Sequence, residues 1–267
     1  MARKDYKGYL IDLDGTLYRG RRAIPEAIEF VKRLQERNLP YLFLTNNASK
    51  TPAQIAEVLD GFDLQVSEDS IYTSGMALAR YLQEDIKKNH PFRGCQEDQP
   101  SIWIVGEQAL REVLEPLKLR LNAENPTYVV MGIDQDINYQ KLLVTSLAVS
   151  KGAQFIVTNL DRALPTERGM LPGNGALVAA VIATTGINPV VVGKPMTAIA
   201  NYALEMLGLS ADEVLLIGDS YDTDIYTGIN AGIDTLLVYT GVTDKQQVAE
   251  KQYKPTFEAD SLSEWEL

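Results

Sequence analysis

Short apolar runs alternate with helical patterns along this 267-residue chain. The apolar runs predict buried strands at residues 8–13, 40–44, 102–105, 128–133, 155–158, 190–192, 214–217 and 235–239. Other stretches predict helices at residues 25–37, 139–150, 175–184 and 196–207, with a further helix start at residues 51–54. Because strands that alternate with helices form parallel sheets covered on both faces, the sequence predicts an α/β fold.

In such sheets, ligands bind beyond the carboxyl ends of the strands. The strand ends that carry polar side chains read IDLDGT, FLTNNAS, VVGKP and LIGDSYDTD. Two of them lie before about residue 50, and two lie after about residue 190. The segment between has its own strand–helix alternation and a polar stretch at residues 87–100 that we interpret as a loop. This arrangement predicts a second domain inserted into the first.

The composition narrows the classes of function. Apolar residues make up 45% of the chain and charged residues 23%, which is ordinary for a soluble globular protein. We find no secretory signal and no run of the roughly 20 apolar residues that span a bilayer, and the single cysteine, Cys95, suits a reducing cytoplasm. The net charge of −11 argues against a nucleic-acid partner, although a bound metal ion and a lysine can still favour a small phosphorylated substrate. We therefore expect a cytoplasmic protein with no nucleic-acid or membrane partner.

Two acids, Asp12 and Asp14, close the first predicted strand. Side chains alternate along a strand, so both carboxylates can project in the same direction. Gly15 allows a sharp turn, and Thr16 can hydrogen-bond across it. The pair therefore fits two interpretations, a strand terminator with a turn or a reaction centre.

A second acidic cluster favours the reaction centre. Asp219, Asp222 and Asp224 follow another apolar run, VLLIG. If the two strands are adjacent, these carboxylates lie close to Asp12 and Asp14, which is costly unless a cation lies between them. Oxygen ligation by a few carboxylates and a substrate phosphate is typical of Mg²⁺. The sequence therefore predicts a magnesium site at this edge of the sheet.

Two further strand ends supply groups that can bind phosphate. In VVVGKP a strand leads to Lys194, which would place an ammonium group at the same sheet edge. In LTNNAS, Thr45 and Asn46 offer a hydroxyl and an amide beside the start of a helix, whose N-terminus favours anions. Each motif also has an ordinary interpretation, a surface lysine in the first case and a polar loop in the second.

The four motifs together are more specific than any one of them. In the order DxDGT, LTNN, GKP and GDSxxTD, they make the chain similar to the phosphotransferases of the haloacid dehalogenase superfamily. Residues 132–142 (GIDQDINYQKL) and 158–175 (TNLDRALPTERGMLPGNG) resemble its NagD-like, p-nitrophenyl phosphatase branch. The resemblance covers nearly the whole chain. It implies a Rossmann-like, doubly wound parallel-sheet core with an inserted α/β cap domain.

By this resemblance, Asp12 is the nucleophile that forms an aspartyl phosphate, and Asp14 is the general acid and then the base. The implied protein ligands of Mg²⁺ are Asp12, the backbone carbonyl of Asp14, and Asp219. The resemblance implies that Asp224 does not bind the metal itself but lies next to its ligands and orients water or Lys194. Dehalogenases of the superfamily lack an acid at the position of Asp14, so its presence favours phosphoryl transfer.

The resemblance also implies how phosphate is held and where the cap is inserted. Lys194 and Thr45, with backbone amides near Asn46, are implied to hold the oxygens of the transferred phosphoryl group. The stretch from Asp12 to Thr45 has room only for a strand, a helix and a strand, so the cap is expected between Thr45 and Lys194. We expect a catalytic core at residues 1–78 and 188–267 and a substrate-specificity cap at residues 79–187.

Within the expected cap, Asn159, Asp161 and Arg162 follow an apolar run and are candidate substrate-binding residues. Arg162 has two interpretations, a group that binds a substrate anion or a solvated loop residue. His90 and Cys95 lie in the polar stretch, and we assign neither a role.

The sequence therefore predicts a Mg²⁺-dependent phosphatase that hydrolyses small phosphomonoesters, of the nucleotide or sugar phosphate type, through an aspartyl-phosphate intermediate. The alternative is a catalytically silent protein of the same fold that binds a phosphorylated metabolite. Nucleotide monophosphates, sugar phosphates, phosphoglycolate and pyridoxal phosphate all fit the chemistry. A homo-oligomer is compatible with the sequence, which does not decide the oligomeric state.

Overall fold

The computed structural model describes residues 4–89, 99–166 and 169–267, so His90 and Cys95 lie outside the described residues. Within these ranges, no helix has the length and apolar character needed to cross a membrane. The chain folds as two compact units. The first unit comprises residues 1–45, 52–72 and 194–267, and the second comprises residues 46–51 and 73–193.

The first unit contains a six-stranded sheet in the order β15, β14, β13, β1, β4 and β5. The pairs from β15 to β4 are parallel. The strands are β1 (Gly8–Ile11), β4 (Tyr41–Thr45), β5 (Ile71–Thr73), β13 (Val214–Gly218), β14 (Asp234–Val238) and β15 (Phe257–Ala259). A short hairpin of β2 (Tyr18–Arg19) and β3 (Arg22–Ala23) follows β1. Because β1 lies between β4 and β13, the carboxyl ends of three strands from distant parts of the sequence meet.

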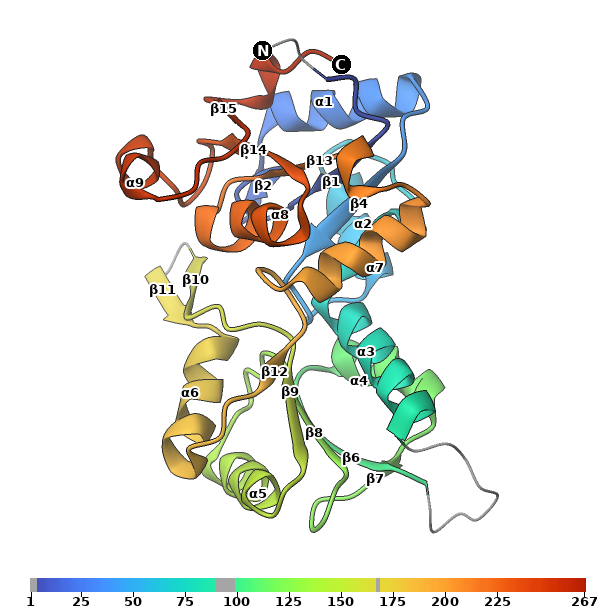
Figure 1. The fold of residues 1–267 in the computed structure, drawn as a ribbon, viewed down its shortest axis with the longest axis vertical. Helices are drawn as coiled ribbons and strands as arrows, with labels where there is room; N and C mark the ends of the chain where they lie inside the picture. Colours follow the sequence, from blue (N-terminus) through green and yellow to red (C-terminus); the bar gives the residue numbers. More distant parts are fainter. Residues whose placement is uncertain (1–3, 90–98, 167–168) are drawn as a thin grey trace. The chain divides into compact units, whose positions relative to one another are not determined.

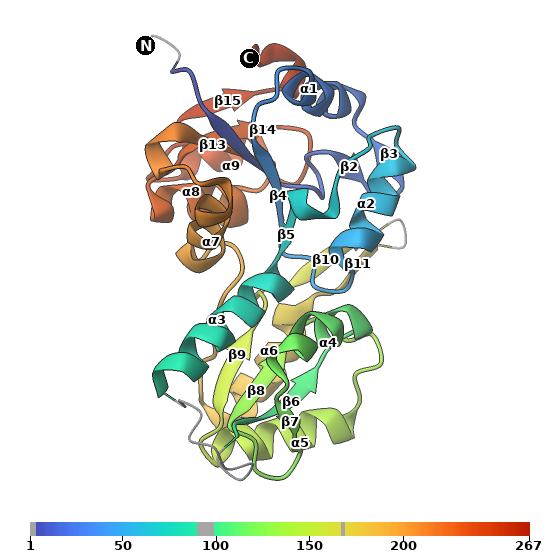
Figure 2. The same cartoon turned by 90° about the vertical axis from the view of Figure 1, so that its right-hand side faces the viewer.

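Helices cover both faces of this sheet (Figures 1 and 2). On one face, α1 (Pro25–Glu36) and α2 (Pro52–Asp60) share a core with Tyr9 and Ile11 of β1. Leu10 is also fully buried and points to the opposite face, as alternation along a strand requires. The helices of that face are α7 (Thr197–Leu207) and α8 (Tyr226–Ala231), and α9 (Lys245–Glu250) precedes β15.

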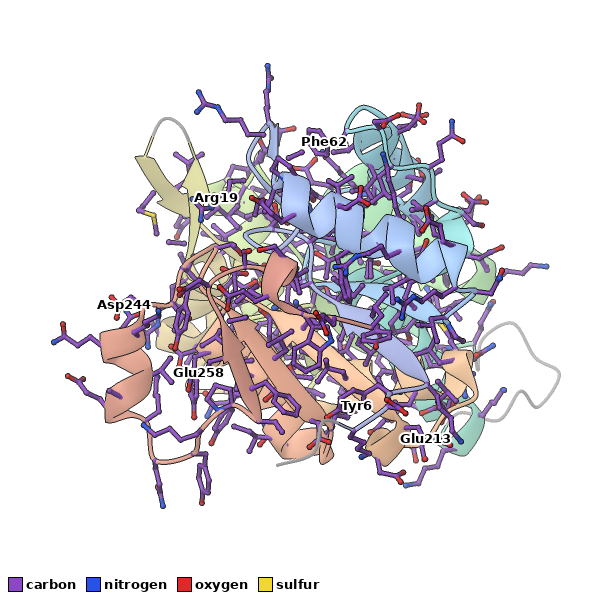
Figure 3. The ribbon with its side chains drawn as sticks, turned by 90° about the horizontal axis from the view of Figure 1, so that it is seen from above. Tyr6, Arg19, Phe62, Glu213, Asp244 and Glu258 are labelled. Atoms are coloured by element: carbon purple, nitrogen blue, oxygen red, sulfur yellow. The ribbon has the colours of Figure 1, made fainter. Side chains whose placement is uncertain are left out.

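Polar contacts fix the amino end of β1. The Tyr6 hydroxyl donates a hydrogen bond to Asp234 at 2.9 Å, and Lys7 pairs with Glu213 at 2.6 Å (Figure 3). Asp234 begins β14 and Glu213 directly precedes β13. These contacts therefore hold the start of β1 against the starts of β13 and β14.

The second unit contains a five-stranded parallel sheet in the order β12, β9, β8, β6 and β7. Its strands are β6 (Ser101–Val105), β7 (Arg120–Leu121), β8 (Tyr128–Met131), β9 (Gln154–Val157) and β12 (Val190–Val191). On one face, α5 (Tyr139–Ser150) and α6 (Asn174–Thr185) form a core with residues of β6, β8 and β9. Two further helices, α3 (Ser74–Asn89) and α4 (Gln108–Leu114), lie together on the other face (Figure 1). A hairpin of β10 (Ala163–Thr166) and β11 (Gly169–Pro172) completes this unit.

The predicted α/β fold with parallel sheets is confirmed, and each predicted strand matches an observed one to within about two residues at either end. One inference about the sheets is wrong. The strand before Lys194, β12, pairs with β9 in the second unit and does not belong to the sheet that contains β1. The polar stretch at residues 87–100 also starts later than expected, because Lys87 and Lys88 still belong to α3.

Candidate active site

The candidate site lies at the carboxyl ends of β1 and β13. These strands pair in parallel with Ile11 opposite Ile217, so the residues that follow them emerge side by side. Asp12 follows β1 and Asp219 follows β13, and the two residues are only 7% and 2% exposed. The Asp12 amide also donates to the Ile217 carbonyl at 2.9 Å, which continues the ladder into the site.

Two glycines make room for the acidic side chains. A Cβ on Gly15 would lie 2.4 Å from Asp219 Oδ2, and the φ of Gly15 is +91°, a conformation that favours glycine. A Cβ on Gly218 would lie 2.3 Å from Asp224 Oδ2. The carboxylates therefore pack directly against backbone, which leaves them little freedom to move.

Lys194 pairs with one acid that follows β1 and one that follows β13. Its Nζ lies 2.5 Å from Asp12 Oδ1 and 2.6 Å from Asp224 Oδ1, and all three side chains are buried. The other oxygen of Asp224, Oδ2, accepts a hydrogen bond from the Ser220 amide at 3.0 Å. Asp224 thus has both oxygens engaged by the protein and holds the ammonium group against Asp12.

Two further groups contact the acids, and sequence reasoning gave neither of them this role. Thr16 Oγ1 lies 3.2 Å from Asp12 Oδ2 and 3.3 Å from Asp219 Oδ1. The Val242 amide donates to Asp219 Oδ2 at 2.7 Å. Thr16 is part of the DxDGT motif and was therefore visible in the sequence, whereas a backbone amide leaves no side-chain signature.

The site holds more buried acids than basic groups that could balance their charge. Burial raises the pKa of Asp12 to about 7; Lys194 opposes this rise, and repulsion from Asp219 and Asp14 adds to it. Burial and Asp224 raise the pKa of Asp219 to about 6. Burial and Asp12 raise the pKa of Asp224 to about 7 against the pull of Lys194. Burial lowers the pKa of Lys194, but Asp12 and Asp224 outweigh burial and raise it. Three buried carboxylates thus face one ammonium group, and a cation would compensate the excess negative charge.

The donor set fits a hard divalent cation. Asp12, Asp219 and Asp224 can each offer an oxygen such that these atoms all lie within 4.8 Å of one another. Carboxylate oxygens without nitrogen or sulfur ligands suit Mg²⁺. Asp222 does not join this cluster, because its side chain is 80% exposed and pairs with Lys251 at 2.6 Å.

Two other predicted site residues lie at the same edge of this sheet. Asp14 is exposed and forms a β-bridge with Tyr18. Burial raises the pKa of Tyr18, and the negative charges of Asp14 and Asp12 raise it further. Thr45 is buried and ends β4, the strand beside β1.

The remaining candidates belong to the second unit. The Asn46 side chain donates to Asp161 Oδ2 at 3.1 Å, and the Asn159 amide donates to the Asn46 carbonyl at 2.9 Å. Arg162 is exposed, and its carbonyl accepts a hydrogen bond from Gly173. The structure thus brings Asn46, Asn159 and Asp161 into one network, while their part in binding phosphate or substrate stays a prediction.

Two protein-family models match the chain. Residues 9–120 match the family described as haloacid dehalogenase-like hydrolase, and residues 191–265 match a second, HAD-hydrolase-like model. The two matches include the strand ends that carry Asp12, Thr45 and Asp219, together with Lys194.

Individual relatives match over nearly the full length. A 5'-nucleotidase, YutF, from Bacillus subtilis is 47% identical over 262 residues, which is 98% of each chain. An acid sugar phosphatase from Staphylococcus epidermidis is 41% identical over 261 residues, covering 97% of this chain and 96% of its own.

Solved structures agree with these relatives. A single mutant of the thermostable NPPase from Geobacillus stearothermophilus superimposes with a TM-score of 0.88 and 42% identity, covering 98% of this chain and 99% of its own. The p-nitrophenyl phosphatase from Archaeoglobus fulgidus superimposes with a TM-score of 0.87 and 34% identity, covering 97% of both chains. The chain therefore belongs to the haloacid dehalogenase-like hydrolases, and within them it is a phosphoric monoester hydrolase of the NagD-like, p-nitrophenyl phosphatase branch.

Proposed function

We propose that this protein is a Mg²⁺-dependent phosphatase that hydrolyses small phosphomonoesters through an aspartyl-phosphate intermediate. The observation that carries the proposal is the buried cluster of Asp12, Asp219 and Asp224 around Lys194. An excess of buried carboxylates costs stability, so its presence indicates a binding or catalytic requirement.

The nucleophile is one oxygen of Asp12. Lys194 holds Oδ1 at 2.5 Å, whereas Oδ2 lies toward Thr16 and Asp219. In the proposed first step, Oδ1 attacks the phosphorus in line, and the bond from phosphorus to the leaving oxygen breaks. Lys194 and Thr45 hold the other phosphoryl oxygens as their charge redistributes.

Asp14 moves the protons. It gives a proton to the leaving alkoxide in the first step, so that a free alcohol departs. In the second step it removes a proton from water, which attacks phosphorus and releases Asp12 and inorganic phosphate. Its exposed side chain, two residues beyond the nucleophile, is supportive because it can reach both a leaving group and solvent.

The residues that would hold Mg²⁺ are Asp12 and Asp219, together with the backbone carbonyl of Asp14. When bound, the metal would neutralise charge on the phosphoryl oxygens and on the acids that hold it. Asp224 would stay with Lys194, because both of its oxygens already have protein partners.

The substrate class is supported by the relatives, which are named as a 5'-nucleotidase, an acid sugar phosphatase and p-nitrophenyl phosphatases. We propose nucleotide or sugar monophosphates as substrates, with Asn159, Asp161 and Arg162 as candidate contacts in the second unit. A panel of phosphomonoesters, ranked by kcat/KM, identifies the preferred leaving group.

The intermediate has a stereochemical test. Two successive in-line displacements at phosphorus give net retention, so hydrolysis of a substrate with a chiral phosphate is expected to retain configuration. Inversion would indicate direct attack by water and would rule out Asp12 as the nucleophile. A parallel assay with excess chelator is expected to abolish turnover and excess Mg²⁺ to restore it.

A further inference from the structure

The loop after β14 packs against the predicted metal ligand Asp219. We define residues 240–243, Thr-Gly-Val-Thr, as the 240–243 clamp. The clamp follows β14 and comes before α9, and it contains none of the residues to which the proposed mechanism assigns a role.

The clamp occupies one oxygen of Asp219. The Val242 amide donates to Oδ2 at 2.7 Å, and the Thr243 amide donates to the Asp219 backbone carbonyl at 3.3 Å. The remaining oxygen, Oδ1, lies 3.3 Å from Thr16 Oγ1, which itself lies 3.2 Å from Asp12 Oδ2. Oδ1 of Asp219 and Oδ2 of Asp12 therefore share Thr16 Oγ1 as a neighbour, which makes Oδ1 the oxygen of Asp219 that is placed to bind a cation together with Asp12.

Gly241 makes this contact sterically possible. A Cβ at this position would lie 1.7 Å from Asp219 Oδ2 and 2.2 Å from its Cγ. Any larger residue must displace either the clamp or the carboxylate, because carbon and oxygen cannot approach so closely.

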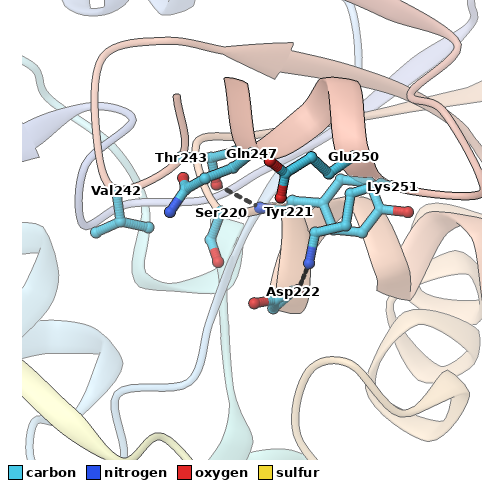
Figure 4. A pocket seen from close by; sticks show the side chains of 8 residues that line it. All are labelled: Ser220, Tyr221, Asp222, Val242, Thr243, Gln247, Glu250 and Lys251. Atoms are coloured by element: carbon cyan, nitrogen blue, oxygen red, sulfur yellow. Dashed lines mark hydrogen bonds and ion pairs between the residues drawn. The ribbon is translucent and has the colours of Figure 1, made fainter. Parts of the chain in front are cut away.

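The clamp is itself held at both ends. Thr240 Oγ1 donates to the carbonyl of Gly15 at 2.8 Å, and the Thr240 carbonyl accepts a hydrogen bond from Arg19 of the β2–β3 hairpin, which is labelled in Figure 3. Thr243 Oγ1 accepts a hydrogen bond from the Tyr221 amide at 2.8 Å (Figure 4). The clamp therefore connects the loop after β1 to the loop after β13.

A surface cavity of about 480 Å³ borders the outer side of the clamp (Figure 4). Val242 and Thr243 line it on one side and Ser220 and Tyr221 on another. Val242 is 60% exposed, so its side chain can be replaced without disturbing a core.

We propose that the 240–243 clamp is a positioning element that fixes Asp219 as a metal ligand through Oδ1 alone. The Val242 amide holds Oδ2, and Gly241 permits the close approach. This proposal rests on the proposed magnesium site. It predicts that metal affinity depends on a backbone amide and on a glycine that do not touch the metal or the substrate.

The main test compares Val242→Pro, which removes the amide donor, with Val242→Ala, which keeps it. Mg²⁺ binding to the metal-free protein is measured by calorimetry and by the Mg²⁺ dependence of Tm. We expect the Kd for Mg²⁺ to rise about 10- to 100-fold in Val242→Pro, the range typical of groups that orient metal ligands, and to stay within about 2-fold in Val242→Ala. The Mg²⁺ concentration needed for half-maximal turnover should rise in parallel.

Two other pairs of variants test the same proposal if Val242→Pro does not fold. Gly241→Ala is expected to weaken Mg²⁺ binding, whereas Gly75→Ala is not, because the nearest atom to a Cβ there is 3.5 Å away. Thr243→Val is expected to weaken binding and Thr243→Ser to restore it, because serine retains the hydroxyl that accepts from Tyr221. Folded variants that bind Mg²⁺ as tightly as the parent would rule out the proposed role of the clamp and leave the proposed function standing. Failure of the parent to bind Mg²⁺ would overturn the proposed function as well.

Discussion

Each unit contains a parallel sheet, but the two units differ in the balance of charged side chains at the carboxyl ends of their strands. In the first unit, three buried carboxylates lie close together, and two of them pair with one lysine that is 3% exposed. In the second unit, the loop after β8 holds one buried acid, Asp134, whose two oxygens both pair with Lys141 at 2.8 and 3.0 Å. Lys141 remains 29% exposed and can be solvated.

The difference separates a balanced pair of charges from a cluster in which the acids outnumber the ammonium group, and a cation would compensate this excess. A balanced pair at the end of a strand satisfies its own charge, and Asp134 also accepts a hydrogen bond from the Asp136 amide. The cluster around Lys194 leaves negative charge uncompensated. Both units have a sheet edge of the same kind, and the side chains at the strand ends determine the charge that each edge holds.

The largest expected effect comes from removing the proposed nucleophile, Asp12. Asp12→Asn should lower kcat by about 10⁴-fold or more, because the proposed mechanism assigns the attack on phosphorus to this carboxylate, while circular dichroism remains unchanged. The corresponding change in the second unit, Asp134→Asn, should leave kcat within about 3-fold. Comparable losses of kcat in both variants would remove the distinction between the two edges.

The second effect is on stability. Lys194→Ala leaves buried carboxylates without their ammonium partner and should lower the free energy of unfolding by about 3–5 kcal/mol at pH 7.5 in the absence of metal. Lys141→Ala should cost about 1–2 kcal/mol, because water can reach the acid that it leaves behind. Urea denaturation of both variants measures the difference, and equal losses would contradict it.

The third effect is a dependence on pH expected at the first edge. Asp12 and Asp224 have pKa values raised to about 7 in the folded protein, above their ordinary values near 3.8. Protonation at these groups therefore stabilises the metal-free protein at low pH, and this stability is lost as the pH rises through about 7. Added Mg²⁺ replaces the protons, so it should raise Tm more at pH 8 than at pH 5.5. A shift in Tm that does not depend on pH would argue against metal binding at this cluster.

The smallest effect concerns a buried amide at the second edge. Asn174 donates from Nδ2 to the Asn159 carbonyl at 2.8 Å, and its buried Oδ1 has no hydrogen-bond partner among the residues that the structure describes. Asn174→Ala should cost about 1–3 kcal/mol of stability, because the Asn159 carbonyl loses its donor, and should leave the Kd for Mg²⁺ unchanged. Calorimetric titration with Mg²⁺ distinguishes this outcome from a change at the first edge.

The comparison also indicates what could be predicted from sequence. Helix α5 was predicted at the observed residues because a helical pattern is a local signal in the sequence, and the structure adds an Asn138 cap at its start. Pairing of β12 with the second sheet was not predicted, since a two-residue strand does not encode its partner. Lys194 nevertheless pairs with Asp12, because the chain re-enters the first unit at Lys194, directly after Gly193.

Within the site, acids and lysines were found because their side chains are chemically distinctive and lie at strand ends. Asp222 was included for the same reason and is exposed, because spacing alone does not show which acids turn inward. The Val242 amide was missed because every residue except proline carries the same group. The Thr-Gly-Val-Thr sequence after a strand was the one available signal, since Gly241 marks a close approach of backbone to another group.

The junctions between the two units carry a consequence for evolution and engineering. Thr45 is the residue after which the chain first leaves the first unit, and Lys194 is the residue at which it finally returns. Both are proposed to hold phosphate, so the borders of the inserted unit coincide with the reaction machinery. We expect a recombination that exchanges this unit between relatives to leave both residues in place when its crossovers fall between Thr45 and Lys194. The insert can therefore diversify freely as a cassette, while the two residues that frame it stay with the recipient.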